Sequence, residues 1–149
     1  MGEIFEDESW SVGKAEVEGL PHLIRMRSEM PKDEQRLRFP KLMVITWSYS
    51  SEGSGLPAPE EYTRMRTFED ALEAGTEARA IGVQAVSLTG AGVKEWRYYT
   101  GDGEAFMASL NLDLFGHDPY PLDIQMWDDD AWLGLSEILA SALPEGEEA

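Results

Sequence analysis

The segment from Phe39 to Tyr49 constrains the fold most, because it is apolar at positions that point to both faces of a sheet. Side chains of a strand alternate between the two faces, so both faces of this strand must be covered. Such a strand is typical of the interior of a sheet rather than its edge. The sequence therefore predicts a layered α+β domain built around Phe39–Tyr49.

The elements after this strand follow a definite order. A helix is expected to begin at Pro59, since proline suits the first turn. Its apolar stripe has helical spacing: Tyr62, Met65, Phe68 and Leu72. Two strands, Ile81–Thr89 and Val93–Thr100, follow as a hairpin. A second helix capped by Asp102 and a strand over Tyr120–Trp127 complete the order β-α-β-β-α-β, which predicts a ferredoxin-like sandwich.

Two further elements are expected outside this ferredoxin-like core. An N-terminal β-hairpin pairs Trp10–Val17 with Leu20–Arg27, and a polar connector leads from it to the strand at Phe39. A C-terminal helix begins at Asp130, which is expected to cap it, and ends at Leu143. In a ferredoxin-like fold both core helices pack on one face of the sheet, so the other face is left to such an addition, a partner or water.

The composition is that of one soluble domain. We predict a single α+β domain over residues 9–143, with flexible acidic ends at 1–8 and 144–149. The chain contains no cysteine, which excludes disulfides and a thiol nucleophile. It shows neither a secretory signal nor an apolar run that could span a bilayer. We therefore expect a cytoplasmic protein that does not enter a membrane.

Charge is distributed very unevenly along the chain. The formal net charge is −17, and no lysine or arginine follows Arg97, although twelve acidic residues do. An acidic surface of this kind repels phosphate backbones and attracts cationic surfaces. We therefore expect a basic protein as partner and no nucleic acid. The only basic region, residues 25–41, is interpreted as a counter-patch or a solvated connector.

The sharpest local feature is the run from Trp127 to Trp132, which contains three consecutive aspartates. One interpretation is a helix N-terminus, where a carboxylate accepts backbone N–H bonds and favours the positive end of the helix dipole. Another is a docking site that mimics phosphates or binds Lys and Arg, with an exposed tryptophan as anchor. A metal site is the third, although Leu133 stands where an EF-hand requires glycine. The predicted partner-binding residues here are Asp123, Trp127, Asp128, Asp129 and Asp130.

Aromatic residues of the predicted strands form a second group. Trp47 and Tyr49, with either the pair Trp96 and Tyr98 or else Tyr99, are expected to line one face of the sheet. RNA-recognition domains stack bases on such a face, but a net charge of −17 argues against that use. Two interpretations stay open: a core covered by the hairpin or the C-terminal helix, or an interface. The candidate binding residues are Trp47, Tyr49, Trp96 and Tyr98.

The sequence contains no catalytic motif. His22 and His117 are the only histidines, and neither has a ligand partner at helical spacing. We therefore predict no catalytic residue, no metal and no cofactor. A small carboxylate- or metal-dependent hydrolase that uses Asp123, Asp128 and Glu95 is kept as an alternative.

Segments spread over nearly the whole chain resemble DUF695, a bacterial family of unknown function. These segments are Pro21–Arg27, Phe39–Tyr49, Phe68–Glu73, Glu95–Tyr99, Pro121–Ile124 and Asp129–Trp132, together with Trp10. The family often has proline where this chain has Ala131. The resemblance implies no catalytic residue. Its wider grouping includes a regulator that inhibits an RNA-degrading enzyme by binding it, which implies a noncatalytic inhibitor as an analogue.

The function predicted from these features is that of a noncatalytic acidic binding protein. The most concrete form is an inhibitor or immunity-type protein that covers the cationic site of a nuclease or toxin. The alternatives are the small hydrolase and an assembly domain, and the oligomeric state stays open. The prediction requires the acidic residues after Arg97 to gather, unopposed, on one side of the molecule.

Overall fold

The computed structural model describes residues 10–51 and 53–148, the side chains of residues 17 and 141–148 excepted. It contains one antiparallel sheet of six strands in the order β1-β2-β4-β5-β3-β6. The strands are β1 (Trp10–Val17), β2 (Leu20–Arg27), β3 (Lys41–Ser48), β4 (Gly82–Gly90), β5 (Val93–Thr100) and β6 (Leu122–Asp128). The helices are α1 (Asp33–Arg38), α2 (Pro59–Leu72), the π-helical turn η1 (Glu73–Glu77), α3 (Gly103–Asp113) and α4 (Leu133–Glu148).

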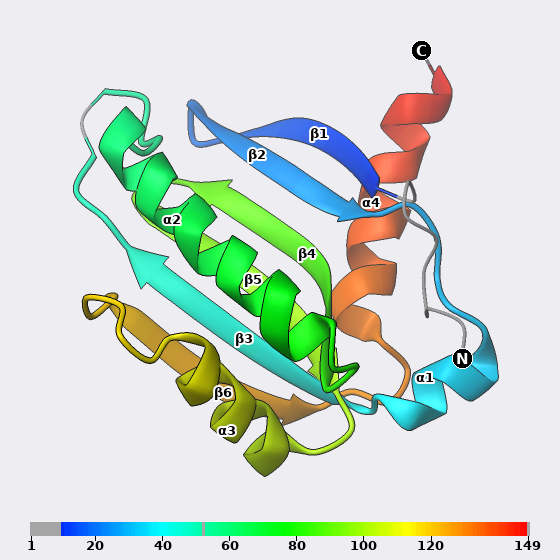
Figure 1. Ribbon diagram of the computed structural model, residues 1–149. Helices are drawn as coiled ribbons and strands as arrows, with labels where there is room; N and C mark the ends of the chain where they lie inside the picture. The colour runs from blue at the N-terminus through cyan, green and yellow to red at the C-terminus, as the bar shows by residue number, and fades with distance from the viewer. Residues whose placement is uncertain (1–9, 52, 149) are drawn as a thin grey trace.

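The α+β class is confirmed, but the predicted ferredoxin-like sandwich with a separate hairpin does not match this strand order. The β1–β2 hairpin is not an addition beside the sheet, because β2 pairs with β4 and so extends the sheet at that edge (Figure 1). An unpaired edge of β4 would leave its N–H and C=O groups without strand partners. Pairing with β2 satisfies them and makes β1 and β6 the two edge strands.

Helices α2 and α3 cover one face of the sheet (Figure 1). The core on this side is aromatic: Phe68 of α2 lies 4.7 Å from Trp96 and 6.1 Å from Trp47, measured between ring centroids. All three rings are fully buried. Burial of such large rings contributes much of the stability of a small domain.

The other face of the sheet is covered by α4, which packs against β2 and β4. Trp132 stacks on Tyr99 of β5, with ring centroids 3.8 Å apart and planes 7° from parallel. The indole N–H of Trp132 donates to the carbonyl of Phe39 at 2.9 Å. These contacts hold Trp132 in a left-handed backbone conformation, with φ of 57°, directly before α4.

Two helix predictions differ from the structure. The polar connector before β3 contains α1, which has no buried residue and therefore no apolar stripe to reveal it. The sequence predicts that the C-terminal helix ends at Leu143, but α4 continues to Glu148. The helical backbone thus extends across Pro144, although a proline removes one N–H donor and its ring crowds the carbonyl four residues earlier. The predicted flexible segment 1–8 lies outside the described residues.

Within the described part of the chain, no helix is both long enough and apolar enough to cross a membrane.

Candidate functional site

The predicted acidic site maps to β6, the edge strand next to β3. Asp123, Gln125 and Trp127 alternate onto one face of this strand, and all three are exposed. Trp127 is 55% exposed, which is unusual for so large an apolar side chain. Because β6 pairs only with β3, its other side also presents a free backbone edge.

The cap of α4 is Asp129, so the prediction of Asp130 is wrong. The Asp129 carboxylate accepts hydrogen bonds from the backbone N–H of Leu133 at 2.8 Å and of Gly134 at 2.9 Å. It also accepts from the Tyr99 hydroxyl at 2.6 Å. The chain turns between Asp129 and Trp132, where the Trp132 N–H donates to the Asp129 carbonyl at 3.0 Å, and this turn brings the Asp129 carboxylate to the first N–H groups of the helix. Asp129 therefore serves the fold, whereas Asp130 is exposed.

The acidic residues after Arg97 are not unopposed, which corrects the sequence-based expectation. Asp128 forms an ion pair with Lys41 of β3. Asp113 pairs with Arg79 at 2.6 Å and also accepts from the N–H and hydroxyl of Thr76. Asp102 caps α3, as predicted. The exposed carboxylates without an ion pair among the described residues of this half include Glu104, Asp118, Asp123 and Asp130.

The aromatic candidates are core, so the structure does not present them as an interface. Trp47, Trp96 and Tyr98 are fully buried, and Tyr49 is half-buried with its hydroxyl donating to the carbonyl of Gly55 at 2.7 Å. The cover comes from α2 and α3, not from the hairpin or α4 as expected. The sequence predicts an aromatic face but does not identify which helices lie on it.

The alternative hydrolase residues do not converge. Glu95 pairs with Arg97 at 2.6 Å, and Asp128 pairs with Lys41. Among the residues that the structure describes, no three His, Asp or Glu side chains form a group that could hold a metal ion.

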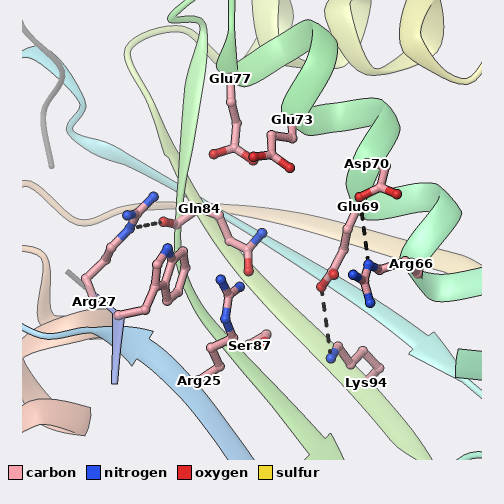
Figure 2. A pocket seen from close by; sticks show the side chains of 11 residues that line it. Arg25, Arg27, Arg66, Glu69, Asp70, Glu73, Glu77, Gln84, Ser87 and Lys94 are labelled. Carbon is pink, nitrogen blue, oxygen red and sulfur yellow. Dashed lines mark hydrogen bonds and ion pairs between the residues drawn. The ribbon is translucent and has the colours of Figure 1, made fainter. Parts of the chain in front are cut away.

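A charged groove, which the sequence did not reveal, lies between α2 and the β1–β2 hairpin. It has a volume of about 450 Å³, and β4 and β5 form its floor. Its lining residues are Trp10, Arg25, Arg27, Arg66, Glu69, Asp70, Glu73, Glu77, Gln84, Ser87 and Lys94. Figure 2 shows the two walls facing each other across the groove, with Glu73 and Glu77 on one and Arg25 and Arg27 on the other.

The hairpin supplies the basic wall of the groove. The ring of Trp10 lies between two guanidinium groups, with the Arg25 carbon 3.8 Å and the Arg27 carbon 4.0 Å from the ring centroid. Arg27 is buried, and its Nε donates to the backbone carbonyl of Gln84 at 3.0 Å. Cation–π contacts of this kind orient the arginines and fix their positions in the wall.

The acidic wall comes from a row of glutamates four residues apart: Glu69, Glu73 and Glu77. This spacing places them on one side of α2 and its π-helical extension η1. The pKa of Glu77 is raised to about 7, by burial first and by the neighbouring Glu73 and Glu69 to a smaller extent, while the backbone N–H of Gln84 and the charge of Arg27 oppose the shift. The ion pair and hydrogen bonds of Asp113 to Arg79 and Thr76 anchor η1, and so hold Glu77 in place.

The floor of the groove contains Lys94, Ser87 and Gln84. Lys94 lies 4.0 Å from Glu69, and burial lowers the pKa of its ammonium. A bulge at Ala85 lets Gln84 and Ser87, three residues apart, both face α2. The Gln84 amide nitrogen donates to the Tyr98 hydroxyl at 3.2 Å, whereas its oxygen Oε1 is buried and has no hydrogen-bond donor in the described part of the chain.

Comparison with known proteins identifies the family. No curated protein and no solved structure matches the chain. The model of a family of unknown function, DUF695, matches residues 8–139, which is most of the chain and includes β6 and the groove. The chain therefore belongs to the DUF695 family.

Proposed function

We propose that this protein is a noncatalytic binding protein that docks on a basic protein partner through β6. The observation that carries the proposal is the exposed edge strand, where Trp127 lies on the same strand face as Asp123 and shortly before the exposed Asp130. No lysine or arginine follows Arg97 in the sequence. The proposed partner surface therefore meets an aromatic anchor that has an exposed carboxylate on either side of it along the chain.

The proposed mechanism separates the roles of charge and of the aromatic ring. Long-range attraction between an acidic protein and a basic one raises the association rate. Burial of a tryptophan at the centre of an interface slows dissociation. In its most concrete form, the partner is a nuclease or toxin, and Asp123 and Asp130 occupy the positions of substrate phosphates in its cationic cleft.

The test uses carboxylates that the fold does not need. Asp129 is unsuitable because it caps α4, and Asp128 because Lys41 already neutralises it. The variant Asp123→Asn/Asp130→Asn removes two exposed charges, four residues before and three residues after Trp127. Its matched control, Glu16→Gln/Glu29→Gln, removes two exposed charges near the opposite edge of the sheet.

Host lysate is passed over each immobilised protein at low salt, and retained proteins are identified by mass spectrometry. We expect wild type and control to retain the same basic protein. With that partner, Asp123→Asn/Asp130→Asn should slow association about three- to tenfold, and added salt should abolish the difference. Trp127→Ala should speed dissociation by about tenfold or more. Retained proteins without a basic bias, or an equal loss in the control, would contradict the proposal.

A further inference from the structure

We propose that the groove between α2 and the β1–β2 hairpin binds a small zwitterion. The ligand presents an ammonium or guanidinium group to Glu73 and Glu77, and a carboxylate or phosphate to Arg25 and Lys94. This site is separate from the proposed protein-docking edge, because β1 and β6 are opposite edges of the sheet.

Arg25 and Glu73, on opposite walls of the groove, are held apart rather than paired with each other. Arg25 contacts the Trp10 ring and has no ion pair among the described residues. Glu73 likewise has neither a hydrogen bond nor an ion pair within the described part of the chain. A volume of about 450 Å³ separates the walls. Ligand pockets typically measure about 300 to 1,000 Å³, so the space suits a small molecule.

A hydrogen-bond acceptor at the floor of the groove lacks a donor among the described residues. Gln84 is only 5% exposed, yet its Oε1 has no donor. An unsatisfied buried acceptor destabilises the fold, so a ligand that supplies the missing donor would be bound favourably there. Ammonium and guanidinium groups carry only donors, and the carboxylates of Glu73 and Glu77 next to this amide favour a cation there.

A ligand with charge of only one sign does not fit the groove. A polyamine would meet the repulsion of Arg25, Arg27 and Lys94, and a free dianion would meet that of the glutamate row. Only a molecule with both charges satisfies both walls at once. Burial lowers the pKa of Lys94 although Glu69 lies 4.0 Å away, so an anionic group of the ligand at the floor would further stabilise the charged form of Lys94.

The test titrates the full chain with four probes, using calorimetry and the shifts of ¹⁵N-labelled backbone amides. L-Arginine combines a guanidinium with a carboxylate, and O-phosphoethanolamine combines an ammonium with a phosphate. Agmatine offers cations alone, and glutarate offers anions alone. We expect at least one zwitterion to bind with a Kd below about 1 mM, and both single-sign probes at least about tenfold more weakly. The better zwitterion identifies the anion class.

Variants locate the binding. Glu73→Gln and Arg25→Gln change exposed side chains on opposite walls, and each should weaken zwitterion binding by about tenfold or more. The controls Glu60→Gln and Lys32→Gln make the same charge changes at exposed positions that do not line the groove, and should bind as wild type does. No zwitterion binding up to about 10 mM, equal binding of agmatine, or equal losses in the controls would overturn the proposal. None of these residues belongs to β6, so failure of the zwitterion proposal would leave the docking proposal unaffected.

Discussion

At the scale of single residues, Glu77 opposes folding when it is ionised. Its pKa is raised to about 7 by burial first and by Glu73 and Glu69 second. A carboxyl with a folded-state pKa above its unfolded value binds its proton more tightly in the folded state. The stability that this proton contributes is fully present below about pH 4.5 and is lost as pH rises through about 7.

We therefore expect Glu77→Gln to gain stability relative to wild type as pH increases. The difference in the free energy of unfolding should grow by about 2–3 kcal/mol between pH 5 and pH 8, since a tenfold change in proton affinity corresponds to about 1.4 kcal/mol. Urea unfolding at several pH values measures it. Glu73→Gln serves as control: it removes one repelling charge and should produce a smaller gain. Parallel pH profiles for wild type and Glu77→Gln would contradict this account.

At the scale of elements, the start of α4 depends on one of three adjacent aspartates. Asp129→Ala removes the acceptor of two helix N–H groups and of the Tyr99 hydroxyl, which burial deprives of water. We expect a loss of about 2–3 kcal/mol in the free energy of unfolding, measured by chemical denaturation.

Two companion variants make this result specific to the element. Asp130→Ala should change the free energy of unfolding by less than about 0.5 kcal/mol, because Asp130 is exposed and makes no capping bond. Tyr99→Phe removes only the hydroxyl, and its loss in the free energy of unfolding should be less than half of the loss caused by Asp129→Ala. Equal destabilisation by Asp129→Ala and Asp130→Ala would contradict the assignment of Asp129, rather than Asp130, as the residue that caps α4.

Elements with a clear hydrophobic period were predictable, and features that depend on contacts across the sheet were not. The strands Trp10–Val17, Leu20–Arg27 and Val93–Thr100 have the predicted bounds, and α2 begins at Pro59 as expected. The strand that pairs with β2 is determined by tertiary contacts, which no local sequence pattern encodes.

The groove could not be predicted from the sequence for the same reason, because it depends on contacts between distant segments. The row Glu69, Glu73 and Glu77 resembles an ordinary solvated helix face in the sequence. In the sequence, Arg25 and Arg27 belong to the same basic stretch as the polar connector. In the structure, both are part of β2 and line the groove. The bulge at Ala85, which turns Gln84 toward α2, lies inside an uninterrupted strand pattern. The four-residue spacing of the glutamates was the available signal.

At the scale of the whole molecule, a net charge of −17 on 149 residues makes the folded state repel itself. Salt shortens the Debye length from about 20 Å at 20 mM to about 6–7 Å at 200 mM, which screens this repulsion. The exposed ion pairs, such as Arg66 with Asp70, weaken as well but contribute little. We therefore expect sodium chloride over this range to raise the free energy of unfolding by about 1 kcal/mol, measured by urea unfolding. The gain should shrink in a variant that neutralises Glu16, Glu29, Asp123 and Asp130 as amides, all of them exposed. A decrease in stability with salt would show that internal ion pairs, rather than net repulsion, dominate the electrostatics of this fold.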